Sequence, residues 1–141
     1  MKKLMLMAVA AAVAAGAGFW TPSGRTADAS KERFFEMRTY TAAPGKLEAL
    51  HARFRDHTNK LFVKHGMELI GYWTPTDGEK VSNTLVYILA YPSKEAREKS
   101  WKDFQDDAEW KKAKDASEVN GKLVDKVESV FLKPTDYSPI K

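Results

Sequence analysis

Apolar and polar side chains alternate along residues 34–41, which predicts a strand that places every second side chain on the same face. From Leu47 to His65 the apolar residues recur instead every three or four positions, the period of an amphipathic helix with one buried stripe. Gly66 follows directly, and glycine tolerates the left-handed conformation that ends many helices. The pattern therefore begins with a strand followed by a helix.

A long hairpin is predicted next, with strands at residues 67–74 and 84–91 and a turn around Asp77-Gly78. Gly71, inside the first of these strands, indicates a bulge or a close approach of another group to the backbone. The second strand is apolar on both faces, a pattern typical of a strand that is covered on both sides.

A second helix is expected to begin after Ser93, a good N-cap residue, and to bury Trp101 and Phe104. The acidic pair at 106–107 predicts a break, followed by a short helix that packs Trp110. The last strand is expected from about residue 126 to 132, and the tail at 134–141, which contains two prolines, is expected to lie across the surface.

The order β-α-β-β-α-β predicts a ferredoxin-like fold of the α+β class, with a four-stranded antiparallel sheet and both helices on one face. In the first strand we expect one set of side chains to face the helices: Phe35, Met37 and Thr39. The other set is then expected on the bare face: Phe34, Glu36, Arg38 and Tyr40. Because a large apolar sheet face is rarely left in water, we expect a homodimer whose sheets pack together as a dimeric α/β barrel.

The first 29 residues have the layout of a secretory signal peptide. Lys2 and Lys3 form a basic start, residues 4–20 are an apolar run rich in alanine, and residues 27–29 are a small-x-small cleavage site. We expect cleavage to leave one domain, residues 30–141, that is exported to the periplasm or secreted and has no stable membrane insertion. A retained anchor and an earlier cut near Ala17 are the alternatives.

Composition narrows the classes of partner and cofactor. The net charge is only +4 and the charges are interspersed, so we expect no nucleic-acid partner. The chain has no cysteine, which excludes disulfides, thiolate nucleophiles and cysteine-ligated metals. The histidines at 51, 57 and 65 are six and eight residues apart, so none forms the i,i+4 pair of a helical metal site. We therefore expect neither a metal nor another cofactor.

Several short segments follow one another along the domain and together form a recognisable pattern. They are Glu36-x-Arg38-Thr39-Tyr40, Pro44-Gly45-Lys46, Gly71-Tyr72-Trp73, residues 85–91 with Pro92-Ser93, then Arg97, Trp101, Phe104 and Asp107-Ala108-Glu109-Trp110. Through them, residues 34–132 resemble the NIPSNAP family of the dimeric α/β-barrel superfamily. Ala108 departs from the family, which often has proline there, and many relatives lack a signal peptide. The resemblance implies the fold and a dimer, but no single reaction.

Glu36, Arg38 and Tyr40 are the first candidate ligand-binding residues, since a guanidinium can clamp an anion while a carboxylate or phenol handles a proton. The alternative is a Glu36–Arg38 ion pair that satisfies itself in the dimer seam. His57 is a candidate acid–base group or haem ligand. Tyr72 and Tyr87 are candidates because their hydroxyls need partners. The alternative is a hydrogen-bonded core or edge position for His57 and a core position for the two tyrosines.

Three functions stay open at this stage. The first is an exported homodimer that binds a small, partly apolar ligand between sheet and helices. The second is an enzyme, such as a cofactor-independent monooxygenase, with Arg38 holding an anionic intermediate and His57 or Tyr40 transferring a proton. The third is a structural or interaction dimer. No catalytic residue follows from the sequence.

Overall fold

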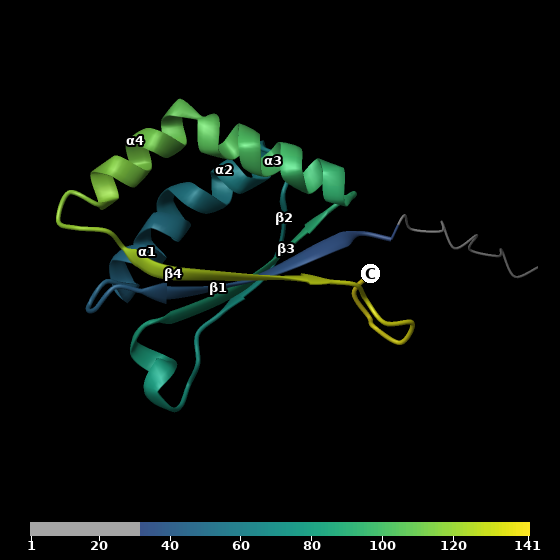
Figure 1. The fold of residues 1–141 in the computed structure, drawn as a ribbon, viewed down its shortest axis with the longest axis horizontal. Helices are drawn as coiled ribbons and strands as arrows, with labels where there is room; N and C mark the ends of the chain where they lie inside the picture. Colours follow the sequence, from purple (N-terminus) through teal and green to yellow (C-terminus); the bar gives the residue numbers. More distant parts are fainter. Residues whose placement is uncertain (1–31) are drawn as a thin grey trace, which may run out of the picture.

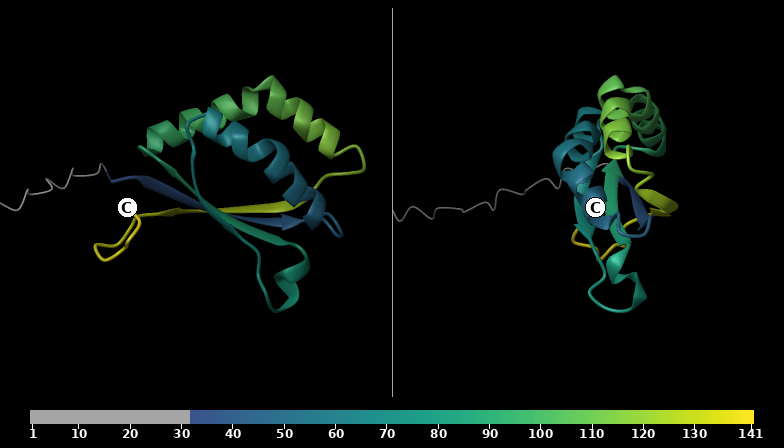
Figure 2. Two further views of the ribbon diagram at one scale, coloured as in Figure 1. Left: turned by 180° about the vertical axis from the view of Figure 1, so that it is seen from behind. Right: turned by 90° about the vertical axis from the view of Figure 1, so that its left-hand side faces the viewer.

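The computed structural model describes residues 32–141, so the predicted signal peptide at 1–29 lies outside the described residues. The elements follow one another as β1 (Phe34–Ala42), α1 (Leu47–Arg53), η1 (Phe54–Thr58), α2 (Asn59–Lys64), β2 (Glu68–Trp73), η2 (Glu79–Ser82), β3 (Thr84–Tyr91), α3 (Lys94–Asp106), α4 (Ala108–Ser117) and β4 (Val124–Leu132). All strand pairs are antiparallel, in the order β2-β3-β1-β4. The helices α1 to α4 cover one face of this sheet (Figure 1, Figure 2). The predicted α+β, ferredoxin-like fold is confirmed.

The prediction of which side of β1 faces the helices was wrong. Glu36 bonds to side chains of α3, and the ring of Tyr40 packs against Phe54 of η1, so the set from Phe34 to Tyr40 lies under the helices. Phe35, Met37 and Thr39 therefore lie on the open face. The alternation along a strand defines two sets of side chains, but it does not determine which set the helices cover.

The core lies between the helices and the inner face of β3, whose residues Leu85, Tyr87, Leu89 and Tyr91 are all buried. The helices contribute Leu50, Phe54, Leu61, Phe62, Trp101 and Phe104 to the same apolar cluster. Aromatic rings fill much of this space edge to face; for example, the centroids of Phe62 and Phe104 are 4.8 Å apart. The predicted burial of Trp101 and Phe104 is confirmed.

Two local predictions from glycine are also confirmed. The register between β2 and β3 shifts between Leu69 and Gly71, so a bulge lies there. A side chain at Gly71 would come within 2.5 Å of the indole of Trp73, which lies against the glycine backbone. Gly66, past the end of α2, has a φ of 81°, the left-handed conformation that ends the helix.

The predicted break in the second helical region lies at Asp107. Ser93 caps α3 by accepting a hydrogen bond from the amide of Ala96, and the helix ends at Asp106. Asp107 then caps α4 by accepting from the amide of Glu109. Lys64 and His65 at the end of α2 also bond to the Asp107 carboxylate, and these hydrogen bonds hold its pKa well below the usual value. Asp107 thus connects the end of α2 to the start of α4.

The open face of the sheet is largely apolar and only partly covered. Phe35, Ile70 and Ile88 line a groove of about 340 Å³ whose other wall is the C-terminal tail, so the tail covers one end of the face. Farther along, Val130 stays 49% exposed. In residues 32–141, no helix has the length and apolar character needed to span a membrane.

Candidate functional site

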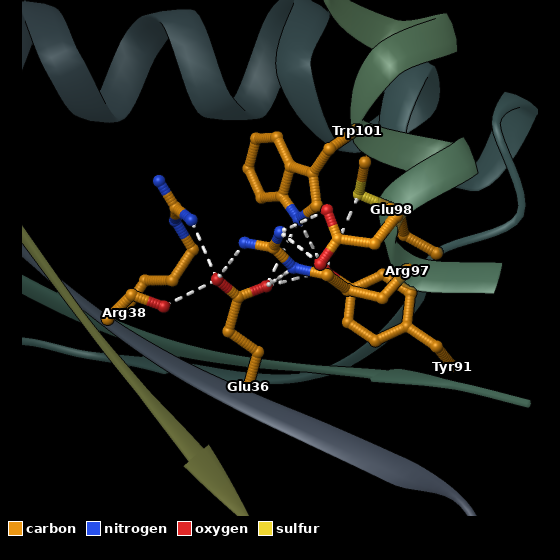
Figure 3. Close-up of polar contacts among 8 residues, drawn as sticks. Glu36, Arg38, Tyr91, Arg97, Glu98 and Trp101 are labelled. Carbon is orange, nitrogen blue, oxygen red and sulfur yellow. Dashed lines mark hydrogen bonds and ion pairs between the residues drawn. The ribbon is translucent and has the colours of Figure 1, made fainter. Parts of the chain in front are cut away.

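The carboxylate of Glu36 lies at the centre of a buried polar cluster and is 0% exposed. Figure 3 shows donors that point toward it from three elements. They are Arg97 and Trp101 of α3, Tyr91 of β3 and Arg38 of β1. Oε1 accepts from Arg97 Nη2 at 2.7 Å, Arg38 Nη1 at 2.8 Å and Ser129 Oγ at 2.5 Å. Oε2 accepts from Arg97 Nε at 3.0 Å, Trp101 Nε1 at 3.0 Å and Tyr91 Oη at 3.1 Å.

These contacts keep Glu36 ionised. Burial alone would raise its pKa, but the hydrogen bonds from Arg97 and Ser129 and the charge of Arg38 outweigh burial and lower the pKa to about 2. A carboxylate offers about four lone-pair positions, and the donors here already fill them. Glu36 therefore has no free capacity to accept a proton from a ligand, and its geometry is that of a structural ion pair within the chain.

Arg38 is held by the same cluster. Its guanidinium donates to Glu36 and lies over the ring of Trp101, 4.2 Å from the centroid, and 5.6 Å from that of Tyr40. The buried Nε of Arg38 makes no hydrogen bond among residues 32–141. The ion pair with Glu36 and the two rings thus hold this side chain in place.

Three phenols gather beside Arg38, around the ring of Phe54. Tyr72 and Tyr87 stack with centroids 5.4 Å apart, and Tyr40 meets Tyr87 edge to face at 5.2 Å. The hydroxyls of Tyr72 and Tyr87 are buried and have no hydrogen-bond partner in the described part of the chain. Burial raises the pKa of both groups, so both stay protonated and can donate. An unmade hydrogen bond of a buried group costs about 1–3 kcal/mol.

A groove of about 450 Å³ opens next to Tyr72, between the first helical region and β2. Its lining consists of His51, Phe54, Arg55, Asn59, Tyr72, Trp73, Thr74 and Leu85. Asn59, another lining residue, has a side-chain oxygen that is also buried without a partner within residues 32–141. We call this feature the Tyr72 groove. Its lining mixes aromatic and aliphatic side chains with polar ones, and two of the lining residues carry an unsatisfied polar group.

A π-helical turn, η1, forms one wall of the Tyr72 groove. The amide of Asn59 bonds to the carbonyl of Phe54, five residues back, and the hydroxyl of Thr58 bonds to the carbonyl of Arg53 at 3.2 Å. The wider turn changes the direction in which the next residues point, and Asn59 is the first residue after it. Single π-turns inside α-helices are frequent at functional sites.

The structure brings together five of the six candidate residues from the sequence. Glu36, Arg38, Tyr40, Tyr72 and Tyr87 all lie between the sheet and the helices. His57 does not join them, because it is exposed on η1 and does not line the Tyr72 groove. Sequence reasoning missed the groove residues His51, Arg55 and Asn59.

His65, the last histidine, has a partner away from the groove, since its Nε2 lies 2.7 Å from Asp107 Oδ2. In residues 32–141, no three metal-ligating side chains come together. Arg53, which lies among charged residues in the sequence, is buried and pairs with Glu118 at 2.9 Å. It links α1 to the end of α4 and takes no part in the groove.

Comparison with known proteins gives a consistent result. Residues 35–139 match the family model described as NIPSNAP. A NIPSNAP family protein of unknown function from Agrobacterium tumefaciens is 25% identical, with 79% of this chain and 96% of that one covered and a TM-score of 0.68. An uncharacterised NIPSNAP domain protein from Burkholderia xenovorans is 26% identical, with 75% and 98% covered and a TM-score of 0.63.

A more distant likeness concerns the fold alone. A protein from Nitrosomonas europaea described as "putative antibiotic biosynthesis monooxygenase" is 13% identical, with 79% of this chain and 96% of that one covered and a TM-score of 0.54. No match was found among the curated proteins.

Proposed function

Because the chain belongs to the NIPSNAP family, we propose that it works as an exported homodimer that binds a small, partly apolar ligand in the Tyr72 groove. The observation that carries the proposal is that two residues of the groove lining each hold a buried, unsatisfied group, the Tyr72 hydroxyl and the Asn59 side-chain oxygen. A ligand that bonds to both would recover the free energy that their burial costs.

The Glu36 cluster is not the ligand site in this proposal. Its carboxylate is saturated, and Arg38 is paired with Glu36 and stacked on Trp101. The cluster instead anchors α3 to the sheet directly beside the three phenols, so that Tyr87 and Tyr72 have a fixed position. A rigid support of this kind is what a selective binding groove needs.

The enzyme alternative has less support. It rests on a likeness of fold to the protein from Nitrosomonas europaea, and function does not follow from fold. Of its two expected proton-transfer groups, His57 is exposed outside the groove, and Tyr40 packs against Phe54 without lining the groove. We therefore propose binding without assigning catalysis.

The open face of the sheet supports the homodimer. With the corrected orientation of β1, this face carries Phe35, Met37, Val86, Ile88 and Val130, which is more apolar than the set expected there from the sequence. Val130 and Trp73 are 49% and 52% exposed in the single chain. A second copy packed face to face would remove these side chains from water.

Native mass spectrometry of the protein, purified from the periplasm or medium of the cells that export it, tests all parts of this proposal together. We expect the mass of two chains that each begin at residue 30, plus a small molecule that denaturation releases. Chains that begin at Met1 would contradict export with cleavage. A single chain at micromolar concentration would contradict the dimer, and a bare protein mass would contradict ligand binding.

A pair of matched variants serves as the control for the dimer. Val130→Glu places a charge on the open face, and we expect it to give single chains that still fold, since the side chain is half exposed already. Val119→Glu makes the same change at a residue that is 77% exposed beyond α4, and we expect it to leave the dimer intact. Equal behaviour of the two variants would place the interface elsewhere.

A further inference from the structure

The residues that line the Tyr72 groove carry positive charge and no negative charge. Arg55 is the one permanently charged side chain in the lining, and no aspartate or glutamate lines the groove. His51 adds a ring that is neutral or positive and never negative. A negatively charged ligand therefore meets attraction and no direct repulsion from the groove walls.

Arg55 is also free to act. Within the part of the chain that the structure describes, it forms no ion pair, whereas Arg38, Arg53 and Arg97 each pair with a glutamate. Arg55 is exposed on η1, so binding an anion would not require an existing pair to break. A guanidinium matches the two oxygens of a carboxylate with two parallel N–H bonds.

Two polar groups on other lining residues fit the same anion. The Tyr72 hydroxyl is buried, unpartnered and protonated, so it can donate to a carboxylate oxygen. The Asn59 carboxamide presents either its oxygen or its NH₂ group after a half-turn of its last bond, so it too can donate. Phe54 and Leu85 supply the apolar contact for the rest of the molecule.

We infer that the ligand of the Tyr72 groove is a small carboxylic acid with a flat apolar body, held by Arg55 and Tyr72 through its carboxylate. This inference rests on the proposed function and specifies the class of its ligand. One guanidinium balances the single charge of a carboxylate. A carboxylate is therefore favoured as the ligand's charged group over a doubly charged phosphate ester.

Calorimetric titration of the full exported protein with 2-naphthoate and with 2-naphthamide, its neutral analogue, tests the inference. We expect naphthoate to bind about tenfold more tightly, because hydrogen bonds to a charged acceptor are stronger than those to a neutral one. In Arg55→Gln this preference should fall to about twofold or less. Lys112→Gln removes a charge from the exposed surface of α4 and should leave the preference intact.

The outcomes separate the two claims. Equal binding of naphthoate and naphthamide, or an unchanged preference in Arg55→Gln, overturns the carboxylate inference and leaves the groove as a ligand site. Tighter binding of 2-naphthyl phosphate than of naphthoate overturns it in favour of a phosphate ester. If no probe binds at millimolar concentration, the inference and the proposed groove function fail together.

Discussion

Glu36→Ala is expected to lower the free energy of unfolding by about 3–5 kcal/mol, the loss typical of one partner removed from a buried ion pair. Arg38 and Arg97 would be left next to each other without the carboxylate that both now contact. Tyr91, Trp101 and Ser129 would each lose an acceptor as well. Urea unfolding followed by circular dichroism gives the change directly.

Glu98→Ala is the matched control for this experiment. Glu98 also pairs with Arg97, at 3.3 Å, but its side chain is exposed. Such exposed pairs contribute about 0–1 kcal/mol, so this variant should unfold close to the wild type. If Glu36→Ala were as stable as Glu98→Ala, the cluster would not be the structural anchor described above.

Acid should remove a similar amount of stability through the same carboxylate. Its folded pKa of about 2 lies below the ordinary 4.5, so Glu36 stabilises the fold fully above pH 4.5 and loses this contribution as the pH falls toward 2. At about 1.4 kcal/mol per pKa unit, the loss is roughly 3 kcal/mol. The expected curve of unfolding free energy therefore declines through the window from pH 4.5 to 2.

Carbon-13 NMR of the side-chain carboxyl groups assigns this decline to Glu36 without a substitution. We expect its signal to titrate with a midpoint near 2. A Glu36 midpoint at or above 4 would show that its donors do not outweigh burial.

The fold was predictable from the sequence because its signals are local. The period of residues 47–65, the cap at Ser93 and the glycines at 66 and 71 each predict one element or its end. Their order then leaves few topologies. The break at Asp107 was equally visible, because an acidic residue before a short helical segment is a typical cap.

The orientation of β1 was not predictable in the same way. Glu36 and Arg38 are charged, which favours a solvent face when residues are considered one at a time. Glu36 is nevertheless buried, because donors from α3, β3 and β4 meet at its carboxylate. Those donors lie 55 to 93 residues away in the chain, and a single sequence does not show that they converge.

Only some residues of the candidate site could be predicted from the sequence, for a related reason. Tyr72 and Tyr87 were identified because a buried phenol needs a partner, and the structure leaves both without one. Asn59 was missed because a regular 3.6-residue period does not place it toward the sheet, whereas the π-turn changes the direction after Thr58.

The central claim is that the Tyr72 hydroxyl serves a ligand rather than the fold, and two Tyr→Phe variants test it most directly. The measurement compares urea stability of the ligand-free protein with the amount of small molecule that co-purifies per chain. We expect Tyr72→Phe to be as stable as the wild type or up to about 3 kcal/mol more stable, and to retain several-fold less ligand. Tyr91→Phe, which loses a bond to Glu36, should be less stable by about 1–3 kcal/mol and keep its ligand. A Tyr72→Phe variant that is destabilised and still fully loaded would contradict the account.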